Sequence, residues 1–411
     1  MIRIRIFTSF ASKEIRAHRL CGDHRCGQQY SRQQYSRQQF GKQRRGRAAL
    51  QGRVSSPKSV WALAPVAVLR SLISSLRSLS NRRVPVLQSA VFSTILTTLL
   101  FSFTLPAHAT TQSAKELLVA GRVDEAISAL QQQTTQSIST QNEAEDRNLL
   151  CRAYFMVEDW DHGIRECERA VALAPNNSNY HLWLGRLYGE KASHSGFFSA
   201  AGLARKVRTE FERAVQLNPE NWEARSDLAE FYLEAPSIVG GGKEKALAQA
   251  QAMAPINPAM AHYVNGRIAE KNKDSATAER EYRIAIDLSH GGALAWLNLA
   301  LFYRHENRFD DMEQALRVME SRPLDRPESL MDGGAVLLRT GRDSQLAIKL
   351  LRKYLASATV EQGPAFKAHY LLGELLERQG DREGAAEQYN AALNLAHEYR
   401  KADQALKRVE P

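Results

Sequence analysis

A two-helix sequence pattern recurs along the chain at a period of roughly 34 residues, and this period constrains the fold more than any other feature. Its clearest copy runs from Ser178 to Asn221. The copy opens with Leu184-Gly185-Arg186-Leu187-Tyr188 and closes with Phe211-Glu212-Arg213-Ala214. One such unit cannot bury its apolar face alone, so several copies must stack to form a continuous core.

Eight copies follow one another after Thr110, and small or apolar residues mark the same place in their first helices. Examples are Cys151, Ala229, Gly266, Ala300 and Gly373. The first copy is partial and the seventh is weak. The regular spacing over so much of the chain excludes a generic helical bundle.

These motifs resemble the tetratricopeptide repeat family, in particular exported bacterial members with insertions in two adjacent repeats. The resemblance implies an all-α fold, a right-handed superhelical solenoid of about eight helix-turn-helix repeats. The solenoid is expected over residues 110–399, and residues 400–411 are expected to end a C-terminal capping helix. The implied function is a non-catalytic scaffold for protein–protein interaction.

The two insertions fall between the first and second helices of neighbouring repeats, at residues 192–206 and 235–242. Such connections lie along one edge of a right-handed stack, so the two insertions are predicted to touch. Phe197 and Phe198 in the first insertion are expected to form an insertion patch. That patch is interpreted as an extension of the second helix, a local lid or a partner surface.

The first helix of each repeat is expected to line the concave groove, with repeat positions 2, 5, 9 and 12 pointing inward. An arginine and aromatic groove suits an extended acidic peptide, because guanidinium groups pair well with carboxylates. The expected partner is therefore a protein or peptide, although an ordinary solvated surface remains an alternative. The predicted groove residues are Arg152, Phe155, Arg186, Glu230, Tyr263, Arg267, Arg304 and Tyr370.

The positive charge of the chain, +10 overall, is concentrated before the repeats. Residues 1–83 hold 18 Lys+Arg and 2 Asp+Glu, and residues 84–109 hold no charge. Residues 110–411 therefore hold 37 basic and 43 acidic residues, a net charge of −6. Nucleic acid is not an expected partner of the mature chain, because phosphate binding needs a basic folded surface.

Residues 1–83 are rich in Arg, Gln and Ser, so they are expected to be a disordered basic leader. The favoured interpretation is sequence upstream of the true start, although no Met lies between Met1 and Met156. A transit peptide is the second interpretation, and it would direct the protein to an organelle lumen. A disordered tail and a segment that binds acidic lipid or nucleic acid remain further alternatives.

Residues 84–109 have the pattern of a secretory signal peptide. An uncharged apolar run follows Arg82-Arg83 and ends in Ala107-His108-Ala109, which places small residues at the two positions that signal peptidase reads. Cleavage after Ala109 would release the protein into the periplasm or the medium. The alternative is a membrane-anchored assembly factor that retains residues 84–105 as a transmembrane helix.

No pattern in the repeats predicts catalysis, a metal site or a cofactor. Gly240-Gly241-Gly242-Lys243 lacks the spacing and the preceding strand of a phosphate loop, so it is interpreted as a turn. The histidines show no metal-binding spacing. An enzyme that uses Ser193, His194 and Ser195 of the 192–206 insertion is kept as an alternative of low weight.

Cys151 and Cys167 are the only cysteines after the leader, and they fall on facing helices of one repeat. In an exported protein this placement permits a disulfide. Two small buried core residues are the alternative interpretation, because both positions favour small side chains.

Overall fold

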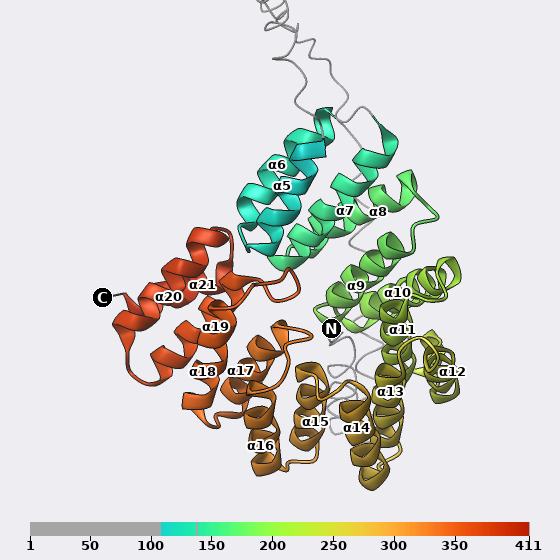
Figure 1. The fold of residues 1–411 in the computed structure, drawn as a ribbon. Helices are drawn as coiled ribbons and strands as arrows, with labels where there is room; N and C mark the ends of the chain where they lie inside the picture. The colour runs from blue at the N-terminus through green and yellow to red at the C-terminus, as the bar shows by residue number, and fades with distance from the viewer. Residues whose placement is uncertain (1–107, 137–138, 411) are drawn as a thin grey trace, which may run out of the picture. The chain divides into compact units, whose positions relative to one another are not determined.

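The computed structural model describes residues 108–136 and 139–410, where seventeen α-helices follow one another and pack in consecutive pairs (Figure 1). The predicted all-α helical solenoid is therefore confirmed. The predicted leader 1–83 and nearly all of the predicted signal segment 84–109 lie outside the described residues.

The structure forms eight helix pairs and one final helix, in the number and order that the repeats predict. The first four pairs are α5 (His108–Val119) with α6 (Val123–Gln136), α7 (Thr140–Met156) with α8 (Trp160–Leu173), α9 (Ser178–Ser193) with α10 (Phe197–Leu217), and α11 (Trp222–Glu234) with α12 (Lys243–Met253). The next four are α13 (Pro258–Lys271) with α14 (Ser275–Leu288), α15 (Ala293–His305) with α16 (Phe309–Glu320), α17 (Glu328–Thr340) with α18 (Ser344–Leu355), and α19 (Ala365–Arg378) with α20 (Arg382–Leu395). The last helix is α21 (Arg400–Val409).

Polar side chains set the start of many helices. An Asp or Asn just before the helix accepts a hydrogen bond from a backbone N–H of the first turn, which would otherwise lack a partner. Residues with this role include Asp159, Asn177, Asn221, Asn257, Asp274 and Asp381.

Close approach of the two helices in a pair depends on glycine. A Cβ atom at Gly266 would lie 2.9 Å from the Tyr282 ring, and one at Gly373 would lie 2.5 Å from the Tyr389 ring. Gly185 faces Phe211 in the same way. The aromatic ring of the second helix therefore fills the space that the absent side chain leaves, which explains why small residues recur at this place in the repeat.

The two insertions take different forms. The first lengthens the second helix of its pair, so that α10 has 21 residues and begins at Phe197. The second forms a short 3-10 helix, η1 (Ser237–Val239), followed by Gly240 with a φ of 104°. Arg208 of α10, two residues beyond the first insertion, donates from Nη1 to the carbonyl oxygen of Val239 at 3.4 Å. A contact of Phe197 and Phe198 with residues 236–242 stays a prediction.

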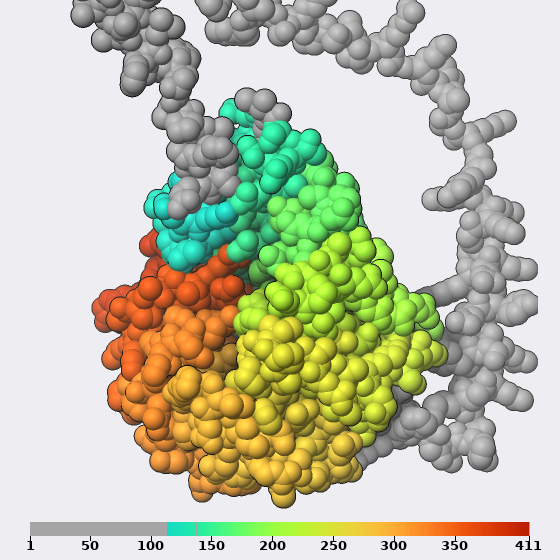
Figure 2. Space-filling view, turned by 45° about the vertical axis from the view of Figure 1, so that its right-hand side comes forward, coloured from blue at the N-terminus to red at the C-terminus, as the bar shows by residue number. Residues whose placement is uncertain are grey.

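The first and last repeats pack against each other, so the solenoid closes on itself. Figure 2 shows the early helices, in cyan and green, lying against the late helices, in orange and red. One buried apolar cluster spans this contact, and the Phe366 and Tyr399 rings within it lie 5.0 Å apart. Its members from the two ends include Ala114, Leu118, Leu149, Ala153, Phe366, Ala392, Tyr399 and Ala402.

Two long connections between successive pairs reinforce the closure. Residues 321–327 and 356–364 are longer than the other connections between pairs, and both reach the first four helix pairs. In the second connection, Thr359 donates to the carbonyl oxygen of Val119 at 2.9 Å, and Glu361 forms an ion pair with Arg152 of α7. In the first, Arg326 pairs with Glu223 of α11.

Among residues 108–136 and 139–410, no helix combines the length and the apolar character that crossing a bilayer requires. The segment 84–105, the predicted anchor in the alternative interpretation, lies outside these residues.

The closure predicts a large effect of Phe366→Ala. Phe366 is fully buried between the two ends of the chain, so truncation should lower the free energy of unfolding by about 3–5 kcal/mol. Urea unfolding followed by far-UV circular dichroism measures the change. Leu247→Ala on α12, where Leu247 is 36% exposed, is the control and should cost about 0.5 kcal/mol or less. Equal losses in the two variants would contradict a closure based on Phe366.

Candidate functional site

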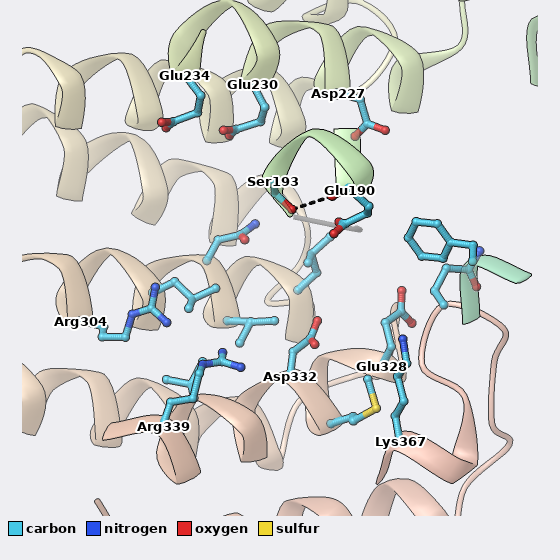
Figure 3. A pocket seen from close by; sticks show the side chains of 18 of the residues that line it. Glu190, Ser193, Asp227, Glu230, Glu234, Arg304, Glu328, Asp332, Arg339 and Lys367 are labelled. Carbon is cyan, nitrogen blue, oxygen red and sulfur yellow. Dashed lines mark hydrogen bonds between the residues drawn. The ribbon is translucent and has the colours of Figure 1, made fainter. Parts of the chain in front are cut away.

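A cavity of about 620 Å³ lies inside the closed solenoid. The first helix of each pair from the second to the eighth contributes to its wall, so the lining comes from α7, α9, α11, α13, α15, α17 and α19. Figure 3 shows side chains of these helices pointing toward one another across the space. The cavity is therefore a property of the closed solenoid and not of any single repeat.

Part of the wall is apolar. Phe155, Leu297, Leu301, Met331 and Val336 reach it from three different helices. These side chains are almost fully buried, with Phe155 the most exposed at 9%. Such a surface offers an apolar ligand group a place out of water.

Charged side chains of both signs line the cavity, and Glu328 and Asp332 of α17 place carboxylates on the same helix as Arg339. Asp227, Glu230 and Glu234 follow one face of α11, whereas Arg304 of α15 and Arg339 of α17 reach in from across the space (Figure 3). A ligand that spans the cavity would thus meet both carboxylates and guanidinium groups.

Arg267 is held by carboxylates of its own chain. Its guanidinium group lies 3.0 Å from Glu230, 2.8 Å from Glu234 and 3.1 Å from Glu270. Burial works against the charge of Arg267, but the carboxylates, Glu230 foremost, raise its pKa well above the ordinary value. The Tyr263 hydroxyl also donates to Glu230, at 2.8 Å.

Arg186 and Arg152 are held in the same way. Arg186 is 3% exposed and pairs with Asp227 at 2.6 Å and with Glu223 at 3.2 Å. Arg152 pairs with Glu361. The Trp183 ring lies between the two guanidinium groups, 5.3 Å from that of Arg152 and 5.0 Å from that of Arg186, which are cation–π distances.

Glu223 links this cluster to the far side of the solenoid. Burial favours the neutral form of Glu223, but the positive charges of Arg186 and Arg326 outweigh that effect and lower its pKa. The Arg326 guanidinium reaches Glu223 at 3.3 Å and Glu328 at 2.8 Å. The same ion pairs therefore connect α9, α11 and the start of α17.

The structure brings five of the eight predicted groove residues into the cavity wall. Phe155, Glu230, Tyr263, Arg267 and Arg304 line it. Arg152 and Arg186 lie beside it in the ion pairs described above. Tyr370 instead packs against Tyr389 and Tyr399, with ring centres 6.0 and 5.6 Å away. Their role in binding a partner stays a prediction.

Several cavity residues were missed because the inner face of the first helix is wider than the predicted stripe. Repeat positions 6 and 13 also face inward, which brings in Asp227 and Asp332 at the first, and Glu190, Glu234 and Arg339 at the second. A helix presents positions three and four apart on one face, so this addition follows from helical geometry. Lys367 falls at the predicted position 2 and could have been named from the sequence.

Lys367 is the unusual cation of the cavity. Within the described part of the chain, its amine has no hydrogen bond or ion pair, and burial lowers its pKa. Lys367 also belongs to the first turn of α19, where the positive end of the helix dipole disfavours a further cation. An anion bound there would relieve both effects.

The Ser193, His194 and Ser195 side chains close the end of α9. The Ser193 hydroxyl donates to the carbonyl oxygen of Glu190 at 2.8 Å, and the Ser195 hydroxyl donates to that of Lys191 at 2.7 Å. His194 Nδ1 lies 2.9 Å from the same Glu190 oxygen, and its ring stacks on Trp160. These contacts cover carbonyl groups that the end of a helix leaves without partners.

Cys151 and Cys167 are joined as a disulfide in the structure, with their Cα atoms 5.2 Å apart. They occupy the places that Gly266 and Tyr282 take in the fifth pair, so the bond replaces a glycine–aromatic contact.

The insertion patch lies away from the cavity. Phe197 is 54% exposed and Phe198 is 90% exposed, and their rings meet edge to face at 5.6 Å. In the described ranges, no group of three or more His, Cys, Asp or Glu residues could hold a metal ion.

The ion pairs around the cavity predict that the stability of the fold decreases in acid. Burial favours the neutral form of Glu270, but a hydrogen bond with His305 and the charge of Arg267 lower its pKa to about 2. A lowered carboxylate pKa adds stability above the unfolded value near 4.3, and that stability is lost as the pH falls toward 2. Glu270→Gln should lower the free energy of unfolding by roughly 3 kcal/mol at neutral pH. The free energy of unfolding of the variant should then fall less steeply as the pH decreases. Urea unfolding at several pH values tests this, and parallel curves for both proteins would contradict it.

Comparisons with known proteins agree with the repeat pattern. The tetratricopeptide repeat family model matches residues 263–325 and 334–405. No curated protein sequence is similar enough to match.

Two solved structures are similar to this chain at low identity. A tetratricopeptide repeat protein from Parabacteroides merdae ATCC 43184 is 13% identical, with a TM-score of 0.38, over 74% of this chain and 98% of its own. MamA is 20% identical, with a TM-score of 0.28, over 40% of this chain and 90% of its own. These TM-scores are too low to carry an argument, so the assignment depends on the matched repeats and the helix pairs. The chain therefore contains tetratricopeptide repeats, and such repeats indicate a scaffold for protein–protein interaction.

Proposed function

We propose that the protein is a non-catalytic scaffold that holds a short segment of a protein partner in its central cavity. The observation that carries the proposal is the cavity itself, which has an apolar wall and charged side chains from opposite helices. Its volume of about 620 Å³ falls in the range of ligand pockets, roughly 300–1,000 Å³. A few residues of a partner fit this space better than a long extended peptide.

The proposed partner segment carries a carboxylate and an apolar side chain. Arg152, Arg186 and Arg267 are already paired with carboxylates of the chain, so they contribute little to attracting an acidic partner. Lys367 has no such partner among the described residues and lies in the wall of the cavity. A partner carboxylate is therefore proposed to bind on the side of α17 and α19, with the apolar group against Leu301 and Met331.

A non-catalytic role is supported by the chemistry of the insertion. The hydroxyl groups of Ser193 and Ser195 are used as donors to backbone carbonyl oxygens at the end of α9. A nucleophilic serine needs its hydroxyl hydrogen-bonded to a base that a third group orients. Ser193 Oγ does lie 3.0 Å from His194 Nδ1, but the same nitrogen lies 2.9 Å from the carbonyl oxygen of Glu190, where it acts as a donor and not as a base. The alternative of an enzyme based on residues 192–206 therefore has less support than the scaffold.

We further propose that the scaffold works in the periplasm or an equivalent compartment. The support is the apolar run and small residues of 84–109, together with the facing cysteines Cys151 and Cys167. The alternatives are an anchored protein that retains residues 84–105 and an organelle protein with residues 1–83 as a transit peptide.

Charge reversal at Lys367 tests the cavity proposal. Lys367→Glu should lower capture of the partner in crosslinking pull-downs from the envelope fraction by about tenfold or more, since a buried charge pair becomes a repulsion. A glutamate in the first turn suits the helix dipole of α19, so the variant is expected to fold. Thermal unfolding checks this point.

The matched control is Lys349→Glu on α18, where Lys349 is largely exposed. It makes the same change of charge outside the cavity wall and should leave capture unchanged. Equal capture by the wild type and the Lys367 variant would contradict binding in the cavity. Equal loss in both variants would point to a general charge effect.

Export predicts a defined mature protein. The protein isolated from cells should begin at Thr110, and Cys151 and Cys167 should resist alkylation until a reductant is added. Intact mass spectrometry with and without reductant measures both properties. A mature chain that still contains residues 84–105 would favour the anchored alternative, and two freely alkylated thiols would contradict an oxidising compartment.

A further inference from the structure

The two insertions expose large apolar side chains on the outside of the solenoid. Phe198 is 90% exposed, Ile238 is 82% exposed and Phe197 is 54% exposed, which are the highest values among the large apolar residues described. Neither the central cavity nor the smaller cavity of about 280 Å³ beside Trp222 is lined by them. Their exposure therefore has no explanation in the site described above.

These side chains lie on one edge of the molecule. The η1 segment that carries Ile238 packs against α10, where Arg208 bonds to the carbonyl oxygen of Val239. Phe198 lies ten residues before Arg208 on the same helix, a distance of about 15 Å along the axis. The helices next to the two insertions, α10 and α12, run on the same side of the solenoid (Figure 1).

The same edge is strongly basic. Residues 191–209 and 235–245, here called the basic edge, contain six Lys or Arg residues and one acid, Glu244, a net charge of +5. Residues 110–411 as a whole have a net charge of −6. The insertions themselves, 192–206 and 235–242, hold two of these cations, Arg205 and Lys206, and no acid, so their charge is also opposite in sign to that of the repeats.

Carboxylates of the chain neutralise only part of this charge. Lys191 pairs with Asp161, Lys206 lies 3.9 Å from Glu168, and Arg208 lies 3.8 Å from Glu212. The exposed cations Arg205, Lys243 and Lys245 form no ion pair with any described residue, although Lys243 donates to Asn272 Oδ1 at 2.6 Å and Lys245 to the carbonyl oxygen of Gly240 at 3.0 Å.

Arg205 also shares a helix face with the apolar tip. It follows Phe198 by seven residues, which is close to two helical turns, so both side chains leave α10 in nearly the same direction. The cation and the ring can therefore meet one surface at the same time.

We propose that the basic edge docks on an anionic lipid bilayer, with Phe198 and Ile238 inserted among the headgroups and Arg205, Lys243 and Lys245 beside the lipid phosphates. Aromatic and aliphatic side chains at an interface, flanked by long cationic side chains, are the combination that anionic membranes attract. Phe198 on α10 and Ile238 on η1 are almost fully exposed and belong to separate segments, which suits a soft lipid surface more than the concave fit of a protein partner. This docking is independent of the proposed cavity function and of the segment 84–105.

Hydrogen–deuterium exchange of the full chain tests the proposal because it reports on each peptide separately. Binding of the apolar segment 84–105 to vesicles therefore does not obscure the result at the basic edge. The first amides of α10 have no helical acceptor and Gly196 provides no side-chain cap, so they exchange fast without a membrane. With vesicles of phosphatidylcholine and phosphatidylglycerol, peptides over 196–206 and 236–245 should exchange about tenfold more slowly. Pure phosphatidylcholine vesicles should produce no such protection.

Variants and a soluble polyanion distinguish docking on lipid from binding of an acidic protein partner. Phe198→Ser with Ile238→Ser should abolish the protection, whereas Leu288→Ser, which alters an exposed apolar residue on α14, should retain it. Retained protection in the double variant would overturn the proposal. Soluble polyglutamate that protects the same peptides as strongly as the vesicles would also overturn it, in favour of an acidic protein partner.

Discussion

The contact between the first and last repeats is the interaction on which the rest of the structure depends. In an open solenoid each repeat contacts only its neighbours, so the stability is a sum of local terms. Here Phe366 and Tyr399 pack with Leu118 in one apolar cluster, although these residues are far apart in the chain. The long connections 321–327 and 356–364 add polar contacts across the interior. The two ends therefore stabilise each other, and the repeats between them are held in one curvature.

Closure also changes what the concave face can do. An open groove of arginines would be available to an acidic peptide, whereas here Glu361, Asp227 and Glu230 already occupy the positions of such a ligand. A buried charge needs a partner, so these pairs hold the helices in place more than they recognise another molecule. The proposed recognition is left to the cavity side of α17 and α19, where Lys367 forms no ion pair with any described residue.

The helix pairs could be predicted because they depend on local pattern. Gly266 and Gly373 mark close approaches within single repeats, and the residues that face them lie in the same repeat. The closure could not be predicted in this way, because it depends on the curvature accumulated over eight pairs. The ion pair of Arg152 with Glu361 joins residues that no periodicity relates. The cavity lining was predicted in part, since positions 6 and 13 of the first helix were not included in the inner face.

The two surfaces differ in how their charges respond to the solvent. In the interior, carboxylates and guanidinium groups are mostly compensated and lie out of water, where salt screens them weakly. On the basic edge, Arg205, Lys243 and Lys245 are exposed, and their attraction to anionic lipid would fall within a Debye length of about 8 Å at physiological salt. Binding in the cavity is therefore expected to survive added salt that releases the edge from a membrane. The same chain could hold its partner while the ionic strength, and not the partner, decides whether the scaffold stays on the bilayer.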